Sequence, residues 1–200
     1  SVTHTFENIF RREGVDAAIV EGDSFHRFNR QEMKLRQAEA EQAGNQNFSH
    51  FGPENNLFTE LEQLFRSYGE TGTGQRRRYL HDAGEAAPYQ QPPGTFTPWE
   101  DVPSTTELLF YEGLHGAVVT PEVNIAQHPD LLIGVVPVIN LEWIQKLWRD
   151  KSQRGYSTEA VTDTILRRMP DYVNYICPQS MHTHVNIEHA PMVDTSNHVI

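Results

Sequence analysis

Two short apolar runs that each end in an acidic residue constrain the fold of this chain most strongly. Residues 16–20 lead into Glu21-Gly22-Asp23, and residues 108–111 lead into Glu112-Gly113. Short apolar runs bounded by turn residues are typical of strands buried on both faces, as in a parallel sheet. A helical pattern precedes the first run and others follow it. The sequence therefore predicts an α/β fold whose strands end in carboxylates, where α/β enzymes place catalytic groups.

The remaining elements are expected from periodicity and breaker residues. In the helix expected at residues 1–12, Phe6, Ile9 and Phe10 face inward, and Cys177 is expected to be a buried small hydrophobe. Residues 83–104, rich in proline and glycine, are expected to form a surface excursion within a single domain. Further helices are expected at 56–68, 142–150 and 158–169, the last with Val161, Ile165, Leu166 and Met169 inside, and further strands at 131–139 and 172–177.

Charge and cysteine content exclude several classes of protein. The net charge of −11 makes broad nucleic-acid binding a poor expectation, because such binding neutralises phosphates. A single cysteine rules out an intrachain disulfide and a cysteine-rich zinc site. No apolar stretch is long enough to span a bilayer and no secretory signal is visible, so a soluble, cytoplasmic protein is expected.

A first candidate cluster lies at residues 21–30. Asp23 could accept a proton from a substrate hydroxyl. His26 and Arg30, four residues apart, could lie on one helical face and clamp a phosphate. The plain alternative is a turn aspartate followed by a solvated polar helix, and the residues alone leave both open.

A second and a third cluster are equally ambiguous by themselves. Residues 76–78 are three adjacent arginines, followed by Tyr79 and His81, and could bind a phosphate or an anionic effector, or form a solvated loop or subunit contact. Glu112 at the end of an apolar strand has the Walker B arrangement, in which the acid meets magnesium beside nucleotide phosphates. Such strands are common, so this pattern is weak by itself.

A fourth cluster follows in the helix at 142–150 and the turn after it. Lys146, Arg149 and Arg154 could close over transferring phosphates as a lid-like region at about 146–158, where fixed cations stabilise developing charge. The alternative is a solvated face with a Glu142–Lys146 pair. The group His182, His184 and His189 invites a metal interpretation, but no cysteine or acidic partner completes a site.

In this order the segments resemble phosphoribulokinases of the bacterial type. The most specific stretches are EGDSFHRFNR at 21–30, LLFYEGLHGAVV at 108–119 and VVPVINLEWIQKLWRDKSQRGYSTEAVTDTILRRM at 135–169, and the likeness extends from residue 5 to residue 197. The resemblance implies a P-loop kinase fold similar to nucleoside monophosphate kinases, with a mixed, mainly parallel sheet flanked by helices. It also implies ATP-dependent phosphorylation of D-ribulose 5-phosphate to ribulose 1,5-bisphosphate in the Calvin cycle.

The same resemblance implies roles for individual residues. Asp23 would deprotonate the C1 hydroxyl of ribulose 5-phosphate, and Glu112 would be the Walker B acid near Mg²⁺. Asp150 would be a second essential carboxylate, acting on metal or by positioning. Substrate would be bound by His26, Arg30, Tyr79, His81 and Arg154, and the ATP phosphates by Lys146 and Arg149.

The bacterial family further implies a homo-oligomer, possibly an octamer, with NADH and AMP as effectors and with Arg12 and Arg168 at the effector or subunit surface. The family also needs a glycine-rich P-loop, which these 200 residues lack. We therefore expect the loop upstream of Ser1, a fragment cut at both ends, and no kinase activity from the fragment alone. The rival expectations are a related kinase for another alcohol, such as uridine or pantothenate, and a non-catalytic effector-binding homologue.

Overall fold

Parallel strand pairs flanked by helices make up the architecture. The computed structural model describes residues 2–190, without the side chains of residues 139, 140, 153 and 154. In chain order, the helices and strands are α1 (Val2–Glu13), β1 (Ala17–Glu21), α2 (Arg30–Gln42), α3 (Phe58–Thr71), β2 (Gln75–Arg76), α4 (Ala83–Ala86), β3 (Glu100–Asp101), β4 (Leu108–Glu112), β5 (Ile133–Pro137), α5 (Ile139–Arg154), α6 (Thr158–Asp171) and β6 (Val185–His189).

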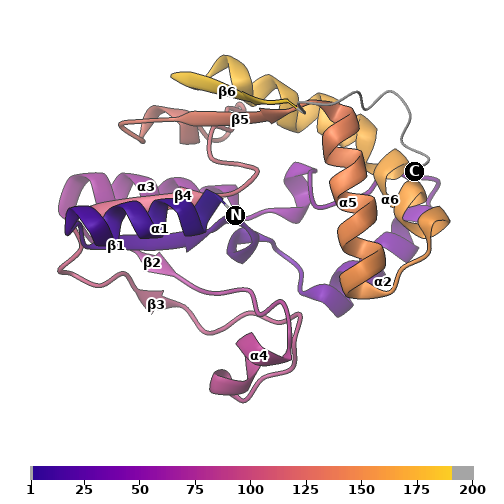
Figure 1. Ribbon diagram of the computed structural model, residues 1–200, viewed down its shortest axis with the longest axis horizontal. Helices are drawn as coiled ribbons and strands as arrows, with labels where there is room; N and C mark the ends of the chain where they lie inside the picture. The colour runs from indigo at the N-terminus through magenta and orange to yellow at the C-terminus, as the bar shows by residue number, and fades with distance from the viewer. Residues whose placement is uncertain (1, 191–200) are drawn as a thin grey trace.

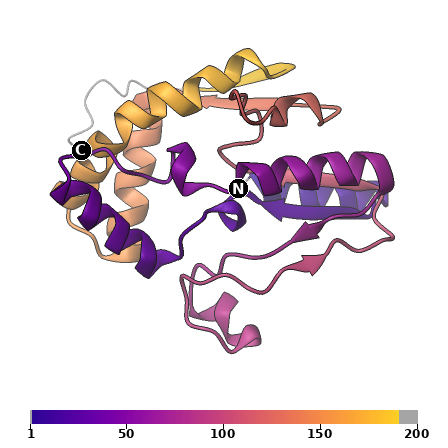
Figure 2. The same cartoon turned by 180° about the vertical axis from the view of Figure 1, so that it is seen from behind.

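The expected strands at residues 16–20 and 108–111 are confirmed as β1 and β4, and they pair with each other. The pairing is parallel, from Ala17 opposite Leu108 to Glu21 opposite Glu112. Helices α1 and α3 cover opposite faces of this pair (Figures 1 and 2). The two acidic strand ends therefore lie side by side at one edge.

Aromatic and aliphatic side chains join these layers. On the α1 side, the ring of Phe110 packs against those of both Phe6 and Phe10, at centroid distances of 4.9 and 5.5 Å. On the α3 side, helical spacing brings one apolar stripe onto β1. The buried cluster consists of Ala18, Val20, Phe25, Leu61, Leu64, Phe65, Val102, Val118, Val123 and Ile125.

The rest of the molecule forms two further parts. Strands β5 and β6 pair in parallel, next to α5 and α6 (Figure 1). Helix α2 reaches α6 through an ion pair between Arg167 and Glu41. Strands β2 and β3 pair antiparallel below β1 and lead to the short helix α4, so residues 83–104 form the expected excursion.

The prediction of a strand at residues 172–177 is wrong. Residues Tyr172–Ile176 form a π-helical turn that continues α6, and Cys177–Met181 form a 3₁₀ helix. Pro170 lies inside α6 and has no N–H to donate, and the widened turn follows directly after it. A run of six residues is too short for its apolar periodicity to separate strand from helix.

Several burial expectations were also wrong. Cys177 is exposed rather than buried, and burial of its thiol, although partial, raises its pKa. Ile9 and Leu166 are 36% and 55% exposed, because α1 packs through Phe6 and Phe10 and α6 through Val161 and Ile165. Strand β4, expected to be buried, is partly exposed, since it pairs with β1 alone among residues 2–190.

Strand β6 at residues 185–189 was not among the expected elements. Within the described part of the chain, no helix has both the length and the apolar character needed to cross a membrane.

Candidate active site

Asp23 lies just beyond the carboxyl end of β1, in a single 3₁₀ turn (Gly22–Phe25). Its carboxylate is about half-exposed, with a side-chain exposure of 46%. The turn sits against the end of β4, where Gly22 and Gly113 approach each other. A Cβ on Gly113 would lie 2.6 Å from the Cα of Gly22, so only glycine permits this contact. The strand pair thus presents Asp23 to solvent beside Glu112.

Two histidines flank the Asp23 carboxylate. Nε2 of His26 lies 3.9 Å from Oδ1, and Nε2 of His81 lies 3.8 Å from Oδ2. Both distances exceed that of a hydrogen bond, so neither ring is hydrogen-bonded to the carboxylate and all three groups keep polar atoms available. Burial lowers the pKa of His26, although the Asp23 charge opposes this, so the ring is mainly neutral at pH 7.

The expectation that His26 and Arg30 share a helical face is wrong. His26 is in extended conformation and forms a β-bridge with Asn56, and α2 begins only at Arg30. Asn29 caps α2 with a capping box and stops the helix from reaching back to His26. The two side chains nevertheless serve one region, because Arg30 Nη2 donates to the carbonyl of His81 at 2.7 Å.

Tyr79 and His81 lie together on the segment that follows β2. Their ring centroids are 4.9 Å apart, and the Arg30 guanidinium lies 6.0 Å from the Tyr79 ring. Arg30 and Tyr79 therefore lie beside His81, whose ring approaches Asp23. The structure brings together four of the predicted substrate residues, His26, Arg30, Tyr79 and His81.

The three adjacent arginines differ in what they contact. Arg76 donates to the carbonyl of Ile19 and to Glu100, both at 3.1 Å. Arg77 donates to two carbonyls of the Asp23 turn region, and Arg78 is exposed. Two of the three guanidinium groups are thus bound to protein oxygens. Arg78 lines a polar recess with Glu7 and Glu21.

Glu112 ends β4 and is exposed, and Thr3 Oγ1 donates to its Oε2 at 3.3 Å. Partial burial raises the pKa of the carboxyl of its register partner Glu21. In the described residues, no group of three or more histidine, cysteine or acidic side chains is placed to hold a metal ion. The Glu112 carboxylate is open to solvent.

Lys146, Arg149 and Asp150 form one ionic group on α5. Asp150 is 4% exposed and accepts from Lys146 Nζ at 2.5 Å and from Arg149 Nε at 3.1 Å. Burial raises the pKa of Asp150, but hydrogen bonds from Lys146 and Arg149 outweigh it and leave the pKa lowered. Burial lowers the pKa of Lys146. Lys146 thus bonds Asp150 rather than Glu142, whose Oε2 has no hydrogen-bond partner among the described atoms.

Arg168 connects the two halves of the site electrostatically. Its guanidinium lies 5.6 Å from the Phe51 ring. Its charge lowers the pKa of His26 and also that of Lys146, in both cases as a smaller cause than burial. Arg12, by contrast, is exposed on α1 and pairs with Glu13 at 2.8 Å. The side chain of Arg154 lies outside the described residues.

His50 and His115 lie behind His26 and were not among the predicted residues. The His50 ring stacks on His26 with a centroid distance of 4.4 Å, and His115 Nε2 lies 3.2 Å from the His50 carbonyl. Burial lowers the pKa of His50 to about 3 and that of His115 to about 4, so both are neutral at pH 7. No sequence signal marks either residue, because an isolated histidine is usually structural.

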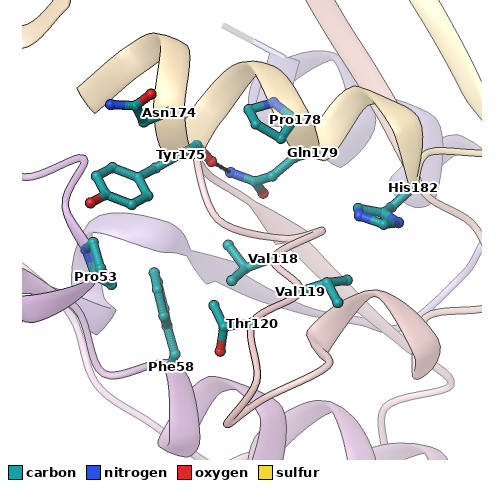
Figure 3. Close-up of a pocket in the computed structure, with 10 residues that line it drawn as sticks. All are labelled: Pro53, Phe58, Val118, Val119, Thr120, Asn174, Tyr175, Pro178, Gln179 and His182. Atoms are coloured by element: carbon teal, nitrogen blue, oxygen red, sulfur yellow. Dashed lines mark hydrogen bonds between the residues drawn. The ribbon is translucent and has the colours of Figure 1, made fainter. Parts of the chain in front are cut away.

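The histidines near the carboxyl-terminal end have separate roles. His184 Nδ1 accepts from the backbone of Leu132 at 2.8 Å. His182 lines an apolar recess of about 100 Å³ with Phe58, Val118, Tyr175 and Gln179 (Figure 3). In this recess Gln179 donates to the Tyr175 carbonyl, and it also anchors the loop after β4 through Ala117 N at 3.1 Å. None of the predicted site residues lines it.

Comparison with known proteins gives consistent matches over nearly the whole chain. The model of the phosphoribulokinase / uridine kinase family matches residues 1–196. A plasmid-encoded phosphoribulokinase of Cupriavidus necator is 75% identical over 197 residues, which cover 98% of this chain and 68% of that protein. The phosphoribulokinase of Nitrobacter vulgaris is 68% identical with the same coverage.

Solved structures agree with the sequence matches. A phosphoribulokinase from Rhodobacter spheroides superposes with a TM-score of 0.88 at 57% identity, covering 100% of this chain and 70% of that one. A D-glycerate 3-kinase from Cryptococcus neoformans has a TM-score of 0.54 at 14% identity, covering 86% of this chain and 73% of that one, and shares the fold alone.

Proposed function

The chain belongs to the phosphoribulokinase / uridine kinase family, and from this premise we propose that Asp23 and its neighbours carry out ATP-dependent phosphorylation of D-ribulose 5-phosphate. The fold is that of P-loop kinases, and the function is that of a phosphoribulokinase, the Calvin-cycle kinase that forms ribulose 1,5-bisphosphate. Identity of 75% over 98% of the chain is the observation that carries this function. Assignment of the individual residues rests on the family resemblance, supported by the site geometry for all of them except Arg154.

Asp23 is the proposed base. The half-exposed carboxylate at the strand end would take the proton of the C1 hydroxyl as the hydroxyl oxygen bonds to the γ-phosphorus of ATP. The bond between this phosphorus and the β,γ-bridging oxygen breaks, and ADP leaves with that oxygen. His26 and His81, on either side of Asp23, are placed to hold the sugar so that the hydroxyl faces the carboxylate.

Substrate binding is proposed for the residues that surround Asp23. Arg30 and Tyr79 lie beside His81, and a fixed guanidinium there suits the 5-phosphate of the sugar. Arg154 is proposed as a further contact with this phosphate. A neutral alcohol such as uridine would gain little from the cations Arg30 and Arg154, which supports a phosphorylated substrate.

Lys146 and Arg149 are proposed to bind the transferring phosphates. Both cations are held by Asp150 in a half-buried position, where charges are screened less than in water. Asp150 would act by fixing these two cations, since both of its oxygens are already engaged by them. Loss of Asp150 would leave two cations without their partner.

Mg²⁺ is proposed as the metal of the reaction. The exposed carboxylate of Glu112 fits this ion, because Mg²⁺ prefers oxygen ligands and commonly uses one or two carboxylates plus substrate phosphates and water. When bound, the ion would neutralise charge on the ATP phosphates.

Regulation and assembly are proposed on the family resemblance alone. A homo-oligomer, possibly an octamer, with NADH and AMP as effectors would use Arg12, which is exposed on α1, and Arg168. The effector role of Arg168 competes with a role at the substrate site, because its charge acts on His26 and Lys146.

The test is ADP release by the full-length protein that contains this chain, with ATP and Mg²⁺. Ribulose 5-phosphate should stimulate release and uridine should not. Stimulation by uridine alone would overturn the substrate assignment, and stimulation by neither compound would overturn the phosphoribulokinase function.

A further inference from the structure

Arg77 holds the backbone of the turn that carries Asp23 and His26. Its Nε donates to the Ser24 carbonyl and its Nη2 to the His26 carbonyl, each at 2.7 Å. These carbonyls lie on either side of Phe25, whose own carbonyl accepts from Leu57 N at 2.8 Å. Three consecutive carbonyls after Asp23 are thus fixed by groups from outside the turn.

Two aromatic rings hold the Arg77 guanidinium in this place. Its central carbon lies 3.7 Å from the Phe96 ring centroid and 4.8 Å from that of Trp99. Trp99 also contacts the buried ring of Phe25, at a centroid distance of 5.6 Å. Burial lowers the pKa of Arg77 to about 10, so the group keeps its charge at neutral pH. The planar guanidinium contacts both rings and donates two hydrogen bonds at the same time, an arrangement that the ammonium group of lysine cannot reproduce.

The position of Arg77 in the chain gives the contact its importance. It lies two residues before Tyr79 and four before His81, so its two hydrogen bonds join the segment that carries these residues to the segment that carries Asp23 and His26. The gap of 3.8 Å between His81 and Asp23 depends on how these two segments are held together.

We infer that Arg77 is a positioning residue, which sets the separation of Asp23 from His81 and thereby aligns ribulose 5-phosphate with the base. This inference rests on the proposed function. Arg77 touches no reacting atom; it acts through the carbonyls of Ser24 and His26. A displacement of about 1 Å at such a site can cost on the order of 100-fold in rate.

The first test compares Arg77→Met, Arg77→Lys and the control Arg78→Met in the full-length protein. Arg78 is adjacent, equally charged and exposed, so Arg78→Met removes the same charge without the fork. Arg77→Met should lower kcat roughly 10- to 100-fold and raise KM for ribulose 5-phosphate at least about threefold, with KM for ATP within about twofold. The kcat and KM values of Arg77→Lys should lie between those of Arg77→Met and the unmodified protein, and Arg78→Met should have the kinetic constants of the unmodified protein.

These readouts separate positioning from a structural role. Partial unfolding would reduce the fraction of protein that is active, and so lower the apparent kcat while leaving both KM values unchanged. Guanidinium ion at non-denaturing concentration should restore activity several-fold in Arg77→Ala, where the vacated space lies between the two rings, and should not affect Arg78→Met. Unchanged kinetics in Arg77→Met, or equal changes in both KM values, would overturn the inference.

A second measurement does not depend on catalysis. In NMR spectra, the ring signals of both His26 and His81 should shift in Arg77→Met and stay in place in Arg78→Met, because Arg77 holds the His26 carbonyl and joins the two segments that carry these rings. Unchanged signals of both rings in Arg77→Met contradict the inference even if the protein phosphorylates another substrate. If Arg77→Met does not fold, Phe96→Leu serves instead: it keeps both hydrogen bonds, weakens the stack and should show the same KM pattern at smaller size.

Discussion

His115 should make the stability of the protein fall as the pH falls from neutral. It is 4% exposed, packs edge-on against Phe58 at 5.1 Å and has a pKa of about 4 against an ordinary value of 6.5. The unfolded chain binds a proton at this residue below pH 6.5, whereas the folded chain does so only near pH 4. Acid therefore favours the unfolded state, and the stabilisation is complete above pH 6.5.

The size of the effect follows from the shift. The difference between 6.5 and about 4 corresponds to about 3 kcal/mol, lost at about 1.4 kcal/mol per pH unit. His26, His50 and Asp23 face the same ring, and His50 adds a loss of the same sign. The comparison with a His115→Gln variant isolates the share of His115, because glutamine keeps a donor for the His50 carbonyl and does not titrate.

The assay is urea unfolding, followed by circular dichroism at intervals from pH 7 to pH 4.5. Between pH 6.5 and pH 5 the unmodified protein should lose about 2 kcal/mol more than His115→Gln. The control is His189→Gln, which removes an exposed histidine on β6 and should leave the pH slope unchanged. Equal slopes for the unmodified protein and His115→Gln would refute the buried neutral state of His115.

Three further changes test the site and its supports. Asp23→Asn should lower turnover by orders of magnitude while binding of ribulose 5-phosphate by calorimetry is largely kept, and near-normal turnover would contradict its role as base. Asn29→Ala removes the α2 capping box and should cost about 1 kcal/mol in chemical unfolding, whereas no loss would show that the cap is dispensable. Gly113→Ala places a Cβ 2.6 Å from the Cα of Gly22 and should lower both thermal stability and kcat, and wild-type values would show that the strand ends separate freely.

Much of the architecture could be predicted from the sequence because its signals are local. The apolar runs before Glu21 and Glu112 and the helical spacing of Leu61, Leu64 and Phe65 indicate β1, β4 and α3 directly. The strand predicted at residues 172–177 was wrong because Pro170 perturbs a helix that continues through this region. That effect depends on hydrogen bonds and leaves the hydrophobic pattern of the sequence unchanged.

The candidate site, like the fold, could be predicted from the sequence only in part. The grouping of Asp23 with His26 could be predicted, since they are only three positions apart in the sequence, and the resemblance added His81. The supports Arg77, His50 and His115 could not, because their partners are backbone carbonyls and rings distant in sequence. The arginine cluster suggested an anion site, and only the structure shows that Arg76 and Arg77 are bound to protein oxygens.

The pairing of β1 with β4 also governs how the site is assembled during folding. The register joins Ala17 to Leu108 and so closes a loop of about 90 residues, at an entropic cost of roughly 4 kcal/mol. Asp23, His26, Arg30, Arg77 and His81 all lie inside that loop. The pairing should form late, since contacts distant in sequence slow folding. The site proposed around Asp23 should then be completed late in folding, once the chain as far as Glu112 has been made and can pair with β1.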